Sequence, residues 1–185
     1  ALPEAETPDS SEDEEEPESE NEQVEGFDAE AATIQLTVAS EAQLRAILLG
    51  EPFTDEEGTE YRYEEIANEQ SLVLTFASNL ALTEPISGIQ RTNVTFRSQE
   101  MPVIVSQTAA ENLMQFAAPV QLTWQRVQQQ GIQSAQGLAQ TTGASTITFE
   151  DTQLELTTTA GRVVNNNQAQ LHFKGTNVVT TATSS

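Results

Sequence analysis

The chain has 185 residues, of which 37% are apolar, and a formal net charge of −22 at pH 7. This length allows one hydrophobic core of moderate size rather than two large ones. A chain this acidic is not expected to bind nucleic acid, because binding a polyphosphate requires clustered Lys and Arg side chains. The sequence has no cysteine, which excludes disulfides, thiolate metal sites and a thiol nucleophile.

Residues 1–31 are expected to form an acidic, disordered linker. They contain fourteen Asp and Glu residues and no Lys or Arg, so the segment repels itself and has little apolar surface to bury. A cation-binding stalk is the alternative for this segment.

A chain that starts at Ala1 is typical of a processed or excised product, as cleavage of a signal peptide would leave it. No run of about 18 apolar residues is present, so no membrane insertion is expected.

A short strand followed by a short helix is expected next. Residues 33–38 alternate polar and apolar side chains, which predicts a strand. Residues 40–50 carry the start and stop signals of a helix. Ser40 offers an oxygen to the free N–H groups of the first turn, and Gly50 suits the left-handed position at the end.

This helix has one apolar face, formed by Leu44, Ile47 and Leu48. A helix this short is not stable alone in water and therefore needs an apolar surface to cover. We expect it to cap the open end of a stack of strands. Residues 51–70 are acidic and rich in turn formers, and are expected to form an inserted loop.

From residue 71 onward, apolar and polar side chains alternate in short segments. A period of two indicates strands with one buried face and one solvated face. The segments recur at irregular intervals of roughly 8–25 residues, and the hairpin dipeptides Asn-Gly and Asp-Gly are absent. We therefore predict an all-β fold, a parallel β-helix over residues 32–185. In such a solenoid, successive coils bury together a core that one coil cannot bury.

The segments between these strands are expected to form turns. The run Asn165 to Asn167 is placed at a coil corner, where stacked asparagines would bond each other's backbones along the solenoid. An ordinary polar turn is the alternative. The glutamine-rich stretch from Gln128 to Gln140 is expected to be a polar loop. Trp124 alternates with Leu122 and is interpreted as a core residue, with a sugar-stacking platform as the alternative.

Several segments together resemble a known family. They are the strand of residues 33–38, the helical run Ser-Glu-Ala-Gln-Leu-Arg-Ala-Ile-Leu from Ser40, and the strand Leu-Val-Leu-Thr-Phe that ends at Phe76. Later stretches such as 145–156 and 169–175 are similar to successive coils. This order resembles a pectate-lyase-like right-handed β-helix, in the adhesive, non-catalytic form of Gram-positive bacterial surface proteins. Members of that family are either polysaccharide lyases and hydrolases or proteins that only bind.

An enzyme of this family would require carboxylates that hold Ca²⁺ beside a basic residue, or carboxylates that converge on a glycosidic bond. Candidates for such a catalytic site are Glu150, Asp151, Glu155 and Arg162, with His172 on a neighbouring strand. The Asn-Thr-Asp, Asp-Asp and Gly-His-Gly signatures of the family's hydrolases are absent. Scattered solvated side chains are the alternative interpretation. In that case no catalytic residue, cofactor or metal is expected, whereas a lyase would add Ca²⁺.

The sequence favours a non-catalytic binding or adhesion module, secreted or attached to the cell surface. Its polar faces of Thr, Gln and Asn would contact a polysaccharide or a host or cell-surface protein. The alternative is a lyase or hydrolase of acidic polysaccharides that acts through the candidate carboxylates. A third hypothesis is a fibre or virion spike subunit, which would form a stable trimer.

Overall fold

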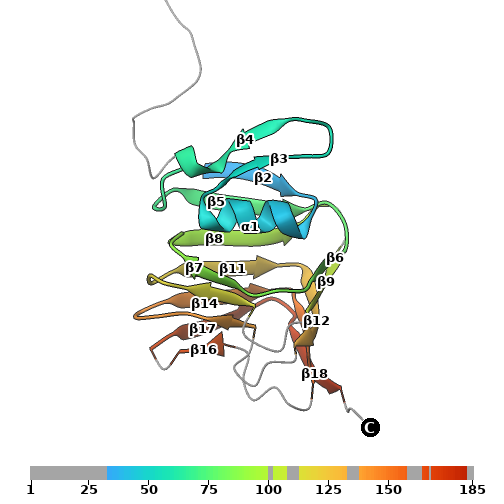
Figure 1. The fold of residues 1–185 in the computed structure, drawn as a ribbon. Coiled ribbons are helices and arrows are strands. Elements are labelled where there is room, and N and C mark those ends of the chain that lie inside the picture. The colour runs from blue at the N-terminus through green and yellow to red at the C-terminus, as the bar shows by residue number, and fades with distance from the viewer. Residues whose placement is uncertain are drawn as a thin grey trace, which may run out of the picture. The chain divides into compact units, whose positions relative to one another are not determined.

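The computed structural model describes residues 33–99, 102–107, 113–132, 138–157, 164–166 and 168–182. From Ile34 on, these residues belong to one compact unit. Its strands form stacked parallel sheets, and one short helix lies near residue 45 (Figure 1). The structure therefore confirms the predicted parallel β-helix with an N-terminal helix. The predicted linker, residues 1–31, lies outside the described residues.

The described strands of the coils belong to three sheets. The first contains β2 (Thr33–Val38), β5 (Ser71–Phe76), β8 (Asn93–Ser98), β11 (Gln121–Gln125), β14 (Thr146–Glu150) and β17 (Gln170–Lys174). The second contains β6 (Leu80–Leu82), β9 (Val103–Gln107), β12 (Val127–Ile132), β15 (Gln153–Thr157) and β18 (Val178–Ala182). The third contains β7 (Ile86–Ile89), β10 (Met114–Phe116), β13 (Ala139–Gln140) and β16 (Val164–Asn165). We call them the first, second and third sheets.

The core lies between these sheets, and its side chains are in register from coil to coil. One column of the first sheet joins Leu74, Phe96, Trp124, Phe149 and Phe173 through parallel pairing. The aromatic rings of this column stack in two pairs, with centroids 4.3 Å apart for Phe96 and Trp124 and 5.3 Å apart for Phe149 and Phe173. Trp124 is fully buried, which confirms it as a core residue.

The helix α1 (Glu41–Leu49) forms as the sequence predicts. The backbone N–H of Gln43 donates to Oγ of Ser40, and Gly50 adopts the left-handed conformation with φ of 69°. Leu44, Ile47 and Leu48 are buried in the core. The helix packs against β7, the end strand of the third sheet, and so covers the core at that end.

Residues 51–70 were expected to be a loop, and this expectation is wrong. They form an antiparallel hairpin of β3 (Pro52–Thr54) and β4 (Glu60–Arg62), followed by the 3₁₀ turn η4 (Tyr63–Glu65). Phe53 and Tyr61 face each other in the hairpin register. Ring contacts with Tyr63 give this acidic segment the small apolar cluster that it needs to fold.

A buried arginine joins the helix to the segment after it. Arg91 is fully buried, and its Nε donates to the carbonyl of Ile47 at 3.0 Å. Its terminal nitrogens donate to the carbonyls of Tyr63 at 2.9 Å and Ile66 at 2.5 Å. Desolvation lowers the pKa of Arg91, because burial penalises the charged form. In the last turn of the helix, the carbonyl of Ile47 thereby accepts from Arg91 as well as from the N–H of Gly50.

The coil corners repeat a left-handed residue between the first and second sheets. Arg126, Asp151 and Gly175 occupy this position in successive coils, with φ of 55°, 54° and 70°. Asn166 in turn bonds the preceding coil, because its Nδ2 donates to Oγ1 of Thr141 and to the carbonyl of Gly143, each at 2.9 Å. Asn166 therefore bonds the backbone of a neighbouring coil from a corner, but its partners there are Thr141 and Gly143 rather than a stacked asparagine. Asn167 lies outside the described residues.

The glutamine-rich stretch from Gln128 to Gln140 was expected to be a loop, and the structure corrects this. Gln128, Gln129 and Gln130 lie in β12, and Gln140 lies in β13. Gln129 pairs with Val105 and Leu154 and is fully buried, so its side chain faces the core. Residues 133–137 lie outside the described residues. Among the described helices, none has the length and apolar character needed to cross a membrane.

Candidate functional site

The first of the predicted catalytic carboxylates, Glu150, lies at the end of β14. Glu150 lies on the outer face of the first sheet, in a column with Arg97, Gln125 and Lys174. Nε2 of Gln125 donates to Oε1 of Glu150 at 3.3 Å. The carboxylate is thus one member of a polar column along the solenoid surface.

Asp151 occupies the coil corner and is engaged by the next coil. Its Oδ1 accepts a hydrogen bond from the backbone N–H of Thr176 at 2.8 Å. Its own N–H donates to the carbonyl of Lys174 at 3.1 Å. A side chain on Gly175 would collide with the Asp151 carboxylate, so the two residues fit each other. These contacts give Asp151 a structural role at this corner.

The structure does not gather the other candidates around Glu150. Glu155 lies in β15 of the second sheet, opposite Thr180, and His172 lies in β17 beside Thr148. Arg162 lies outside the described residues. Within the described part of the chain, no group of three or more His, Asp or Glu side chains is placed to hold a metal ion. The catalytic and Ca²⁺ assignments of the enzyme alternative stay predictions.

The third sheet carries a polar groove, which we call the coil groove. It has a volume of about 320 Å³ and runs beside β7, β10 and β13. It is lined by Gly88, Gln115, Phe116, Ala117, Gln140, Thr141 and Thr142. Gly88 has φ of 77° and nothing within 4 Å of the position of a side chain, so this wall stays open.

A row of hydrogen-bonding side chains follows the coil groove. Gln115 pairs with Gln140, and Gln140 pairs with Asn165, on the outer face of the third sheet. Oγ of Ser87 donates to Oε1 of Gln115 at 2.9 Å and extends the row by one coil. We call these four residues the polar row.

The core fixes the position of this row. Ile86, Met114 and Ala139 alternate with row residues along the strands, and all three are buried. Because side chains alternate along a strand, each buried neighbour directs a row residue outward. Neighbouring strands are about 4.8 Å apart, so the row offers polar groups at that repeat along the solenoid axis.

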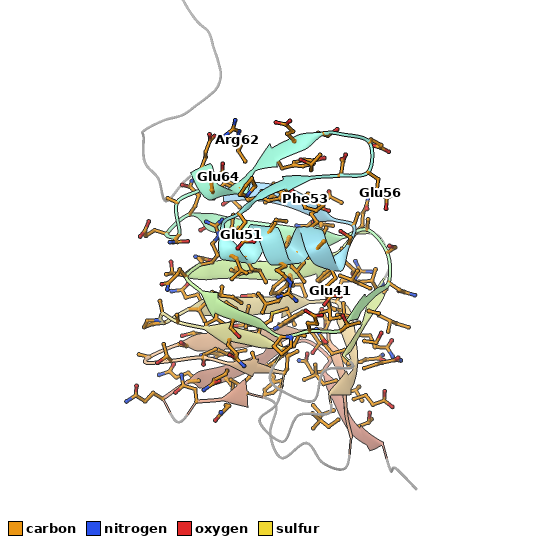
Figure 2. All side chains as sticks on the ribbon, in the orientation of Figure 1. Glu41, Glu51, Phe53, Glu56, Arg62 and Glu64 are labelled. Atoms are coloured by element: carbon orange, nitrogen blue, oxygen red, sulfur yellow. The ribbon has the colours of Figure 1, made fainter. Side chains whose placement is uncertain are left out.

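A second groove lies between the hairpin, α1 and β2, and we call it the hairpin groove. Its volume is about 640 Å³. Phe53 and Tyr61 provide aromatic surface, and Ala39 and Ala42 provide small apolar surface. Figure 2 shows Phe53 on β3 and Glu56 at the turn of the hairpin, with Arg62 at the opposite end. Pockets of this size accommodate small ligands or side chains of a partner.

The aromatic side chains of the hairpin groove are fixed in place by Tyr63 and Gln43. Tyr61 stacks on Tyr63 with ring centroids 5.5 Å apart and planes 15° apart. Tyr63 is buried, and its hydroxyl accepts a hydrogen bond from Nε2 of Gln43 at 3.0 Å. Oε1 of Gln43 accepts from the N–H of Ala39 at 2.9 Å. The end of β2, the helix and the rings are therefore connected through one amide.

Both of these tyrosines titrate above their ordinary value. The pKa of Tyr61 is raised above 10.0, first because its hydroxyl donates to Oδ2 of Asp55, 3.2 Å away. The pKa of Tyr63 is raised mainly because burial removes water from the hydroxyl. Oδ1 of Asp55 accepts from the N–H groups of Glu57 and Thr59, each at 2.9 Å, so Asp55 also shapes the turn.

Comparisons of the chain with protein-family models, with curated proteins and with solved structures found no match. The fold and these grooves are therefore the basis for a functional proposal. The sequence predicted neither groove: Gln140 was assigned to a polar loop, and Ser40 only to the start of the helix. Met114 and Phe116 flank Gln115 in a period of two, and that local signal would have placed Gln115 on an outer face.

Proposed function

We propose that the chain is a non-catalytic binding module that holds a polysaccharide along the coil groove. The observation that carries this proposal is the polar row of Ser87, Gln115, Gln140 and Asn165 beside that groove. An extended sugar chain parallel to the solenoid axis would meet an amide or hydroxyl at each coil. Amides donate and accept hydrogen bonds, as binding to sugar hydroxyls requires.

The net charge of the chain indicates which class of polysaccharide it would bind. The chain has 29 acidic and 7 basic residues, so it repels polyanions. The groove lining contains no charged side chain that would offset this repulsion locally. We infer that the ligand is an uncharged polysaccharide. An acidic polysaccharide, the expected substrate of the lyase alternative, is disfavoured by the same charge, and no contact of Glu150, Asp151 or Glu155 favours that alternative.

The proposal includes a location outside the cell, either secreted or attached to the cell surface. The resemblance to adhesive β-helices of Gram-positive surface proteins supports this location and the adhesive role. A solenoid also suits an extracellular binding surface, because its polar columns are repeated on a rigid core. A host or cell-surface protein is the second class of ligand compatible with such a surface.

The test is calorimetric titration of the full chain with soluble oligosaccharides of uncharged glucans, mannans and xylans. We expect binding to at least one of them, and about tenfold weaker binding by Gln115→Ala/Gln140→Ala, because two hydrogen bonds are lost. Thr95→Ala/Thr123→Ala removes two outward hydroxyls from the first sheet and serves as the matched control. Equal weakening by both double variants, or binding only to acidic polysaccharides, would contradict the proposal.

A further inference from the structure

The hairpin groove is a second, chemically different cavity, and its features do not depend on the polar row. It combines aromatic rings, alanine methyl groups and carboxylates, whereas the coil groove is lined mainly by uncharged polar residues. Its volume of about 640 Å³ is twice that of the coil groove. The two grooves therefore suit different ligands.

The Tyr61 ring is suited to contact a cation. Tyr63 stacks on it at 5.5 Å, and Tyr61 itself stays half-buried beside the groove. The Tyr61 hydroxyl donates to the carboxylate of Asp55, which increases the negative charge around the ring. A Lys or Arg cation over the face of such a ring is attracted by its quadrupole.

The charges around the groove have one sign. Asp55, Glu56 and Glu57 contribute to its lining, and no Lys, Arg or His does so. Glu56 and Glu57 are exposed, so their side chains are free to reorient towards a bound cation. Ala39 and Ala42 provide apolar contacts for the methylene stem of a long basic side chain.

The chain itself offers no suitable occupant. Residues 1–31 contain no Lys or Arg. The seven basic residues of the whole chain are single, and even the nearest two, Arg91 and Arg97, are six positions apart, so a second copy provides no basic segment either. Among the described bases, Arg91 is buried and Arg45 donates to the carbonyls of Glu84 and Pro85. None of the 185 residues therefore forms a basic segment that would suit the groove.

We propose that the hairpin groove binds a lysine- or arginine-rich segment of a partner protein. A basic side chain lies against Tyr61 and Phe53, and its cation is neutralised by the carboxylates of the hairpin turn. The net charge of −22 attracts such a segment from a distance, and the groove retains it.

The test is a titration of the full chain with acetylated, amidated tetralysine, followed by backbone NMR shifts at physiological salt. We expect shifts at residues 53–61 and at the start of α1. Glu56→Gln/Glu57→Gln should weaken the binding that these shifts report by about fivefold or more. Glu64→Gln/Glu65→Gln removes the same charge outside the groove lining and should change this affinity less than twofold. Tyr61→Leu should weaken it as well, without a change in charge.

Two results would overturn the proposal. Equal weakening by the two glutamine double variants would mean that tetralysine responds only to net charge. Binding of chitosan oligomers at residues 53–61 without binding of tetralysine would make the ligand an amino sugar. If Tyr61→Leu does not fold, the glutamine variants decide alone, because they change only exposed side chains. Failure here leaves the coil groove untouched, since none of its lining residues is changed.

Discussion

Arg91 donates its Nε to the carbonyl of Ile47 at 3.0 Å, across 44 positions of sequence. The bond joins the last turn of the N-terminal helix to the corner after β7 in the first complete coil. The same guanidinium holds the carbonyls of Tyr63 and Ile66, so the helix, the 3₁₀ turn and the solenoid share one donor group. Gly50 lies beside it, where its φ of 69° favours glycine.

Arg91→Met is therefore expected to destabilise the fold strongly. The substitution keeps an apolar stem but removes three hydrogen bonds from a charged donor, each worth about 1.5–3 kcal/mol. We expect a loss of about 3 kcal/mol or more in the free energy of unfolding, measured by urea titration. The control is Arg62→Ala, whose exposed pair with Glu64 at 3.5 Å should contribute less than about 1 kcal/mol. A loss at Arg91 no larger than at Arg62 would show that the cap does not depend on this contact.

Much of the fold was predictable because its determinants are local. Ser40 and Gly50 mark the helix, and the alternation around Leu74 and Phe96 marks strands. Arg91 was not predictable, since nothing in its neighbourhood distinguishes a buried arginine from a solvated one. Its carbonyl partners lie 25 to 44 positions away.

The grooves could not be predicted from the sequence for the same reason, because their residues come together only through contacts between distant segments. Gln115, Gln140 and Asn165 meet only because three coils stack in one register. That register depends on the length of every intervening turn, which the local pattern does not fix. The hairpin was missed because its apolar cluster needs Tyr63, beyond the strands, to complete it.

The apolar face of the helix can be tested with Leu44→Asp. Leu44 is fully buried, so an unpaired carboxylate there would separate the helix from the core and expose it. We expect loss of the cooperative unfolding transition, or aggregation seen by light scattering. Ala42→Asp introduces the same charge on the exposed side of the same helix and should remain folded and monomeric. A folded, monomeric Leu44→Asp variant would show that the helix is not a cap.

Gln129 is expected to lower the stability of the native protein. It is fully buried, and neither Oε1 nor Nε2 has a hydrogen-bond partner among the residues that the structure describes. Gln129→Leu removes this desolvation cost while keeping a similar volume, and should raise the free energy of unfolding by about 1–3 kcal/mol. Gln128→Leu changes the neighbouring outward side chain and should have little effect. A loss of stability in Gln129→Leu would indicate that water or another group satisfies the amide in solution.

The corner role of Asp151 separates a structural from a catalytic interpretation. Asp151→Ala loses the bond to the N–H of Thr176, and should lower the free energy of unfolding by about 1 kcal/mol. Glu155→Ala removes the same charge from the second sheet and should change stability by less than about 0.5 kcal/mol. If both variants are as stable as the parent, the Asp151 contact contributes nothing, and a role in chemistry becomes the better explanation for this carboxylate.

The tyrosine pair of the hairpin predicts how stability changes in alkali. The chain has two tyrosines, and both have a pKa raised above 10.0 in the folded state. Between the unfolded and the folded pKa the native state binds more protons, so the free energy of unfolding falls as the pH rises through this window. Below it, the contribution is fully present. Absorbance titration of the phenolates should show both groups ionising late, and urea unfolding should show the parallel loss of stability.

Asp55→Asn distinguishes the two causes of the raised pKa values, which are the hydrogen bond to Asp55 for Tyr61 and burial for Tyr63. It removes the charge that faces Tyr61 while keeping an oxygen for the N–H groups of Glu57 and Thr59. The pKa of Tyr61 should then fall towards 10.0, because its largest cause is the hydrogen bond to Asp55. The pKa of Tyr63 should stay raised, because burial dominates it. If both phenolates still ionise as late as in the parent, Asp55 does not raise the pKa of Tyr61. In that case Asp55 also does not add the negative charge beside the Tyr61 ring that the hairpin groove is proposed to use.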